Sequence, residues 1–291
     1  MKSRISFCKT TGSGAFRFPW IDRTVFRKNV TRFAPLWSLY LIGGLLVLLS
    51  MTAGYSERST AGLLGEFLGY FAFVNMIYGC LTAQMLFGDL FQSRLCNALH
   101  ALPLRRETWF FTHVLSGLAF SVVPHTVATA VLMLRLGAYA YLAPLWMMGM
   151  LLEYLFFFGL AVLCVFCTAN RVAMATVYGI MNFLALIFRW FVETVYIPLM
   201  YGVVADGAIF SIFCPVMWLP EHAGSFLEVG SLRDVSLGSG WIYLTVLAGL
   251  GIAFLVVGLL LYRRRALECA GDFMAVKCLK PVFSVACTLF F

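Results

Sequence analysis

A single carboxylate lies near the middle of a long apolar run of this chain. That residue, Glu153, is flanked by leucines and a tyrosine, and an acid in such surroundings is costly to bury and is a candidate functional residue. Other apolar runs offer three polar partners, Asn75, Gln84 and His125. These four are our candidate pathway residues. Glu153 either faces a central pathway, bonds to one of these partners, or is protonated in a structural hydrogen bond; we favour the structural bond.

A short basic segment, residues 89–108, separates two other apolar runs. Residues 92–102 can form about three helical turns with leucines at helical spacing, before Pro103 ends the helix. Its apolar side could contact another protein, while its arginines add charge-assisted contacts, bind anionic lipid, or do no more than set topology. The candidate partner-contact residues are Arg94, Leu95, Leu99, His100, Leu102, Pro103, Arg105 and Arg106.

The sequence has no convincing motif for nucleotide, protease or metal chemistry, so an enzyme is not favoured. The sequence has no GxxxxGK[ST] and no HExxH, and its SxxK at Ser6–Lys9 falls in a basic tail, so no residue set cradles nucleotide phosphates or forms a hydrolytic site. Cys164 and Cys167 form a CxxC inside an apolar run without nearby histidine, which is typical of buried packing rather than a metal site. We expect this chain to bind no cofactor.

The composition places these residues in a membrane. The chain has 291 residues, of which 62% are hydrophobic and 12% charged, and soluble domains have about 25% charged residues. Apolar runs long enough to cross a bilayer predict an all-α integral membrane protein. The six predicted spans are residues 35–54, 67–87, 109–134, 144–168, 172–192 and 241–262.

The positions of the basic residues predict the orientation. With the N-terminus inside, 17 of the 21 lysines and arginines fall in predicted cytoplasmic stretches, as the positive-inside rule requires. The basic surplus therefore reflects membrane topology and interaction with lipid, and no nucleic-acid partner is expected. The predicted location is the cell membrane.

Three further regions complete the predicted organisation. Residues 1–34 form a cytoplasmic tail with an interfacial helix, 35–262 the six-span domain, and 263–291 a cytoplasmic segment with the start of a possible seventh span. Residues 194–240 are external yet apolar and proline-containing, which favours short re-entrant helices. The final apolar run is too short to cross a bilayer, so we expect the chain to be part of a longer protein, a short interfacial tail being the alternative.

Several local features predict contacts inside the bundle. Pro124 should kink the third span, with a neighbouring helix satisfying the carbonyl that the proline leaves free. Gly65 and Gly69 form a GxxxG, a weak signal of close helix packing. Arg189 and Glu193 are one helical turn apart and should form an ion pair.

Two segments resemble the permease subunits of ABC transporters of the ABC-2 type, and among these the Firmicutes-like members. Leu102-Pro103-Leu104-Arg105-Arg106 is similar to the signature that follows a short cytoplasmic helix in this family, and YRRRALECAGDF at 262–273 is similar to the segment after the sixth span. The resemblance implies a six-helix permease bundle, an elbow-like helix before the first span, and re-entrant helices before the sixth. It also implies docking of the cytoplasmic helix on a separate ATPase subunit, which binds the ATP.

The predicted function is that of a membrane permease subunit of an ATP-driven exporter. Its partners would be an ABC ATPase subunit and a second permease half, which is either an identical or a different chain. A proton-coupled secondary transporter is an alternative, although such proteins carry several ionisable residues near the membrane midplane and paired broken helices. A membrane enzyme using Glu153 with His125 is the third class.

Overall fold

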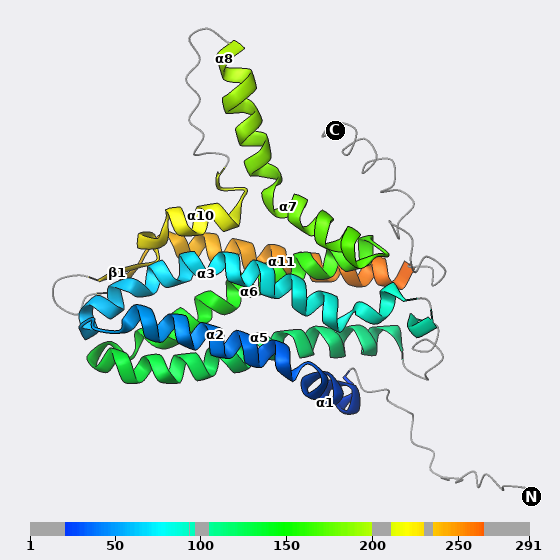
Figure 1. The fold of residues 1–291 in the computed structure, drawn as a ribbon, viewed down its shortest axis with the longest axis horizontal. Helices are drawn as coiled ribbons and strands as arrows, with labels where there is room; N and C mark the ends of the chain where they lie inside the picture. The colour runs from blue at the N-terminus through cyan, green and yellow to red at the C-terminus, as the bar shows by residue number, and fades with distance from the viewer. Residues whose placement is uncertain (1–20, 93, 97–104, 200–210, 230–234, 265–291) are drawn as a thin grey trace, which may run out of the picture.

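The computed structural model describes residues 21–92, 94–96, 105–199, 211–229 and 235–264. Most of the described chain is helical, as Figure 1 shows. The tail before residue 21, the core of the basic segment and the apolar run at the end of the chain lie outside the described residues. The predicted seventh span therefore has no structural counterpart to compare.

Six helices of the described residues are long and apolar enough to cross a membrane, which confirms the predicted number of spans. The helices that build them are α2 (Ala34–Thr52), α3 (Glu57–Leu86), α5 (Arg106–Leu136), α6 (Leu142–Cys167), α7 (Arg171–Phe191) and α11 (Gly240–Arg264). Shorter helical turns are η1 (Gly88–Phe91) and η2 (Gly137–Tyr139).

Two span boundaries differ from those predicted. α3 starts about ten residues before the predicted 67, because the Ser56 side chain caps it by accepting the backbone N–H of Ser59. α7 continues past the predicted 192 through the π-helical turn η3 (Val192–Tyr196) into α8 (Ile197–Leu199). The sequence interpretation placed boundaries at charged residues, but a helix can continue beyond the membrane core.

α6 is the central helix and packs against α11, α3 and α5. Its crossing with α11 is close because glycines face each other. A Cβ built on Gly251 would lie 2.6 Å from the carbonyl oxygen of Leu155, and one built on Gly159 would clash with the Gly251 carbonyl. No side chain fits between the backbones at this crossing, so glycine is required on both helices.

Pro124 lies inside α5, which continues through it to Leu136. Proline has no N–H and cannot donate to the carbonyl four residues earlier, which is that of Phe120. The hydroxyl of Tyr78 on α3 donates to this carbonyl at 2.9 Å. A neighbouring helix thus satisfies the freed acceptor, as predicted.

The N-terminal helix α1 (Arg23–Arg32) crosses one end of the bundle at an angle to the long helices (Figure 1). The Asp22 carboxylate caps its first turn, accepting from two backbone N–H groups. On its inner side Asn29 is buried, and its amide donates to Ser116 of α5 at 3.3 Å. The predicted helix before the first span is therefore present and is held against α5.

The opposite end of the bundle carries α10 (Pro215–Glu221), η4 (Ala223–Ser225) and a small hairpin. Its antiparallel strands are β1 (Leu227–Val229) and β2 (Val235–Leu237). α10 packs on α3 at the predicted GxxxG: a Cβ built on Gly69 would lie 2.7 Å from the carbonyl oxygen of Leu219, and Gly65 similarly meets Ala223. The two glycines therefore make room for α10 and η4 and not for a second spanning helix.

Candidate functional site

Glu153 lies on α6 in the centre of the bundle and is completely buried. Its Oε1 accepts a hydrogen bond from Nδ2 of Asn75 on α3, at 3.1 Å. Its other oxygen, Oε2, has no hydrogen-bond partner among the described residues. Of the three partners considered from sequence, Asn75 is thus the one that contacts Glu153 directly.

Asn75 continues the polar contact to two further helices. The hydroxyl of Tyr40 on α2 donates to Oδ1 of Asn75 at 2.6 Å, and the same hydroxyl lies 3.2 Å from Nε2 of His125 on α5. The Nδ1 of His125 lies 2.7 Å from the carbonyl oxygen of Ser121. These five residues form what we term the core polar chain, which joins α2, α3, α5 and α6.

The hydrogen bonds of the core polar chain can point in either direction, from donor to acceptor. Tyr40 has one proton to donate, and the Asn75 amide can present its oxygen or its nitrogen to it. In one direction donors point from His125 toward Glu153; in the other, a protonated Glu153 donates to Asn75 and the order reverses. Glu153 and His125, the titratable groups at the two ends, exchange donor and acceptor roles between these states. The first direction requires a doubly protonated His125 ring, because Nδ1 already faces the carbonyl oxygen of Ser121, and the second requires a protonated Glu153.

Glu153 and His125 do not touch each other. Asn75 and Tyr40 lie between them, so the two titratable groups do not converge on one substrate atom, as an acid and base pair must. Among the described residues no group of three His, Cys, Asp or Glu side chains is placed to hold a metal ion.

Gln84 lies apart from the other three candidates. Its amide Nε2 faces Met174 Sδ at 3.3 Å and donates to the carbonyl oxygen of Arg171 at 3.4 Å. Both partners belong to the first turn of α7, at the end of the bundle where the arginines gather. Gln84 therefore joins the ends of α3 and α7 and is not part of the core polar chain.

The basic segment is described only at its two ends. Arg94–Cys96 is helical, with Arg94 and Leu95 exposed, and Cys96 N–H donates to the Gln92 carbonyl. After the gap, Arg105 is exposed and precedes the first turn of α5. The remaining contact candidates, which lie outside the described residues, are Leu99, His100, Leu102 and Pro103.

The far side of the segment is tied to the last helix. Glu107 Oε1 forms an ion pair with Arg263 Nη2 at 2.7 Å, and Arg106 Nη1 donates to the Arg263 carbonyl at 3.5 Å. Beside it, Tyr262 packs on Trp109 with ring centroids 5.5 Å apart. The start of α5 and the end of α11 thus form a joint, which we term the α5–α11 clasp.

Sequence reasoning missed two members of the core polar chain, Tyr40 and Ser121. Both are common in membrane helices and neither carries a charge, so composition alone gave no reason to single them out. A usable signal was present for Ser121, which lies four residues before His125 and hence on the same helix face. Tyr40 had no such signal, because its contacts come from other helices.

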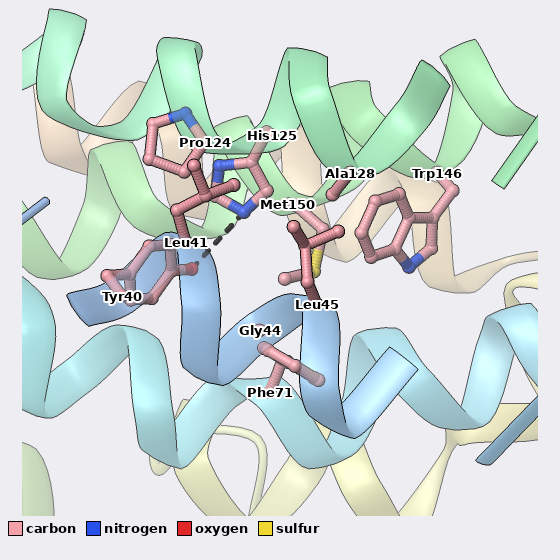
Figure 2. A pocket seen from close by; sticks show the side chains of 10 residues that line it. All are labelled: Tyr40, Leu41, Gly44, Leu45, Phe71, Pro124, His125, Ala128, Trp146 and Met150. Atoms are coloured by element: carbon pink, nitrogen blue, oxygen red, sulfur yellow. Dashed lines mark hydrogen bonds between the residues drawn. The ribbon is translucent and has the colours of Figure 1, made fainter. Parts of the chain in front are cut away.

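The core polar chain borders a small pocket between α2, α3, α5 and α6 (Figure 2). Tyr40 and His125 line it together with the indole of Trp146, and the other walls are apolar. The residues that line it are Tyr40, Leu41, Gly44, Leu45, Phe71, Pro124, His125, Ala128, Trp146 and Met150.

No family model, curated protein or solved structure matches this chain. The fold and the site define its class by themselves. The described residues contain six helices long and apolar enough to cross a membrane, and four of them carry the buried core polar chain; these features make it a multi-pass membrane protein.

Proposed function

We propose that this chain is the membrane-spanning permease subunit of an ATP-driven ABC exporter of the ABC-2 type. A separate ATPase subunit would bind and hydrolyse the ATP, and a second permease half would complete the translocation pathway. The present chain would supply half of that pathway and the contact that receives motion from the ATPase. It would perform no catalysis itself.

The observation that carries this proposal is the α5–α11 clasp. Residues 97–104, the core of the basic segment, lead directly into α5, and the Glu107–Arg263 ion pair of 2.7 Å connects that helix start to α11. A force applied to the segment would therefore reach two spanning helices at once. α11 is in turn packed on the central helix α6 through the glycine crossing, so the motion would extend to the middle of the bundle.

The proposed orientation places the clasp on the cytoplasmic side of the cell membrane. The basic ends of α1, α5, α7 and α11 fall at one end of the bundle, whereas α10 and the β-hairpin cap the other (Figure 1). Basic residues resist translocation, which supports a cytoplasmic N-terminus. The apolar helix α10 would then lie in the outer leaflet as the predicted re-entrant element.

Replacing Leu99 and Leu102 by aspartate tests the docking role. Both residues lie in the cytoplasmic segment, so membrane insertion should be unchanged, but the variant should no longer co-purify with an ATPase subunit or stimulate its hydrolysis. Gln92→Asp, an exposed change before the core of the segment at residues 97–104, is the matched control and should retain the subunit. If the double variant still co-purified with the ATPase subunit, the segment would not be the docking element.

The core polar chain favours one second candidate, a proton-coupled secondary transporter. A buried carboxylate and a buried histidine joined by hydrogen bonds are components of proton relays in membrane transporters. Two observations count against it. Only one such acid lies in the described core, and proton coupling would give the α5–α11 clasp no evident role. We therefore rank this function second, and the effect of Glu153→Gln distinguishes the two.

A further inference from the structure

A groove separates the second half of α7 from α10. Figure 1 shows that the end of α7 that leads into α8 stands away from the bundle, whereas α10 lies along it. The two helices meet where α10 begins, and there the thiol of Cys214 donates to the backbone carbonyl oxygen of Asn182 at 3.3 Å. Beyond this contact they diverge and leave an open groove of about 560 Å³, a volume typical of small-molecule sites.

The inner part of the groove, nearest the contact between the two helices, is apolar. On α7, Leu186 and Ile187 line it about one turn beyond Asn182. On α10, Met217 lines it in the first turn after Cys214. These three side chains offer no hydrogen-bond donor and no charge. The inner part therefore suits the apolar body of a ligand.

The outer part of the groove carries its charge. Glu193, in the π-helical continuation of α7, lies two turns beyond Leu186, and Glu221 lies one turn beyond Met217 on α10. Arg189 Nε bonds Oε1 of Glu193 at 2.9 Å, so these two charges offset each other. Glu221 is exposed, and its carboxylate has no ion pair or hydrogen bond among the described residues. The described lining, with one arginine and two glutamates, therefore has a surplus negative charge at Glu221.

Trp190 forms an aromatic wall of the same groove. It follows Leu186 by one turn of α7, and 63% of its surface is exposed. The face of an indole ring attracts an ammonium group electrostatically, and it also packs against hydrocarbon. Either part of an amphipathic ligand that lies on this ring changes the surroundings of the indole. Trp190 therefore reports whether the groove is occupied.

We propose that this groove binds amphipathic cations, molecules with one ammonium group and an apolar body. The ammonium group would lie at the mouth beside Glu221, and the apolar body would fill the inner part. A zwitterionic lipid headgroup offers the same ammonium group, but its phosphate would bring a negative charge into a groove that already has a surplus of one. The proposal goes beyond the proposed function, because it assigns a ligand site to the chain itself. Binding is measured on the purified chain without an ATPase, so its failure would leave the docking role of the basic segment untouched.

The test uses protein labelled with 5-fluorotryptophan in a non-ionic detergent and ¹⁹F NMR. The Trp190 signal is identified by its loss in Trp190→Phe. Titration with decyltrimethylammonium should shift this signal saturably. Decylphosphocholine, which has the same chain and the same trimethylammonium group but adds a phosphate, should not shift it over the same concentrations. An equal shift with decylphosphocholine would mean that the groove takes a lipid headgroup, and no saturable shift with decyltrimethylammonium would mean that it takes no cation; either result overturns the proposal.

Two glutamate substitutions assign the binding to the groove. Glu221→Gln keeps the size of an exposed side chain and removes the surplus charge, so the fold should be retained and the affinity for decyltrimethylammonium should fall about fivefold. Glu66→Gln removes the same charge from an exposed position of α3 that does not line the groove, and it should bind the cation normally. Unchanged affinity in Glu221→Gln, or an equal loss in both variants, would overturn the assignment of the ammonium group to Glu221.

Discussion

At the scale of single residues, the core polar chain explains how a buried carboxylate is tolerated. Glu153 has one bonded oxygen and one unpartnered oxygen among the described residues, so its environment provides a single hydrogen bond and no counter-charge. Buried charges are normally paired. Because Glu153 has a hydrogen bond but no counter-charge among the described residues, its environment suits the structural role favoured from the sequence, in which the carboxyl group is protonated. The unpartnered Oε2 remains free for a proton or for a polar group of a transported molecule.

Glu153→Gln separates these two roles. Glutamine has the same size and keeps an oxygen to accept from Asn75, so the fold should be retained and transport should fall less than about tenfold, which corresponds to roughly 1.4 kcal/mol. Transport by the reconstituted complex and thermal unfolding in detergent are the measurements. Glu153→Leu is the comparison, because it leaves the Asn75 amide without an acceptor and should destabilise by about 1–3 kcal/mol.

Complete loss of transport in a correctly inserted Glu153→Gln protein would contradict the structural role. It would show that the ionisable proton of Glu153 is required, and would favour the proton-coupled transporter over the ABC permease.

Tyr40→Phe should destabilise the attachment of α2. The change removes the hydroxyl that contacts Asn75 at 2.6 Å and His125 at 3.2 Å, but keeps the ring that stacks on Tyr78 with centroids 3.9 Å apart. We expect a loss of about 1–3 kcal/mol in unfolding free energy, because a buried amide loses its donor. Thermal unfolding by a fluorescence scan is the measurement.

The control for this change is Tyr70→Phe. Tyr70 lies on α3 with 58% of its surface exposed, and its hydroxyl has no hydrogen-bond partner among the described residues, so its removal should leave stability unchanged. Equal effects of the two substitutions would mean that the Tyr40 hydroxyl contributes nothing specific. A double variant with Asn75→Leu should be less destabilised than the sum of the single changes, since both remove the same contact.

At the scale of elements, the packing of α6 on α11 depends on glycine. Gly251→Val should destabilise the bundle, because the new side chain would meet the Leu155 carbonyl and push the helices apart. Gly249→Val on the same helix is the matched control, since a Cβ there has no neighbour within 4 Å. Expression level and unfolding temperature should fall for position 251 and stay constant for 249. The opposite order would place the tight crossing elsewhere.

The sequence predicted the elements better than their contacts. Hydropathy and length gave six spans, because a helix in lipid must satisfy its own backbone and cover the bilayer core. The i to i+4 spacing of Arg189 and Glu193 gave their ion pair, formed at 2.9 Å. Such local rules need no knowledge of neighbouring helices.

Contacts between helices could be predicted only in part. Polarity pointed to Asn75, Gln84 and His125 as partners for Glu153, but only Asn75 contacts it directly. His125 is connected to it through Tyr40 and Asn75, and Gln84 binds elsewhere. Tyr40, which joins Asn75 to His125, carries no sequence signal. Which polar side chains meet depends on helix rotation and depth, and these follow from packing over the whole bundle rather than from any one span.

At the scale of the whole molecule, the separation of charge along the bundle is the main argument for orientation. Arg106 and Arg263 lie together in the clasp, whereas the far end carries α10, a short helix that is largely apolar and contains two prolines. The native thiols are poor probes of this arrangement. Cys214 is 1% exposed and Cys96 is 3% exposed, and burial also raises the pKa of the Cys214 thiol, which disfavours the reactive thiolate.

Engineered cysteines at exposed positions give the decisive test of orientation. Ser239, just before α11, and Gln92, just after η1, are both exposed and lie at opposite ends of the bundle. In intact cells, a membrane-impermeant maleimide should label Ser239→Cys but should reach Gln92→Cys only after the membrane is permeabilised. The unsubstituted protein gives the background. Labelling of Gln92→Cys in intact cells would invert the bundle, and would remove the basic segment from the side of the membrane where an ATPase could bind it.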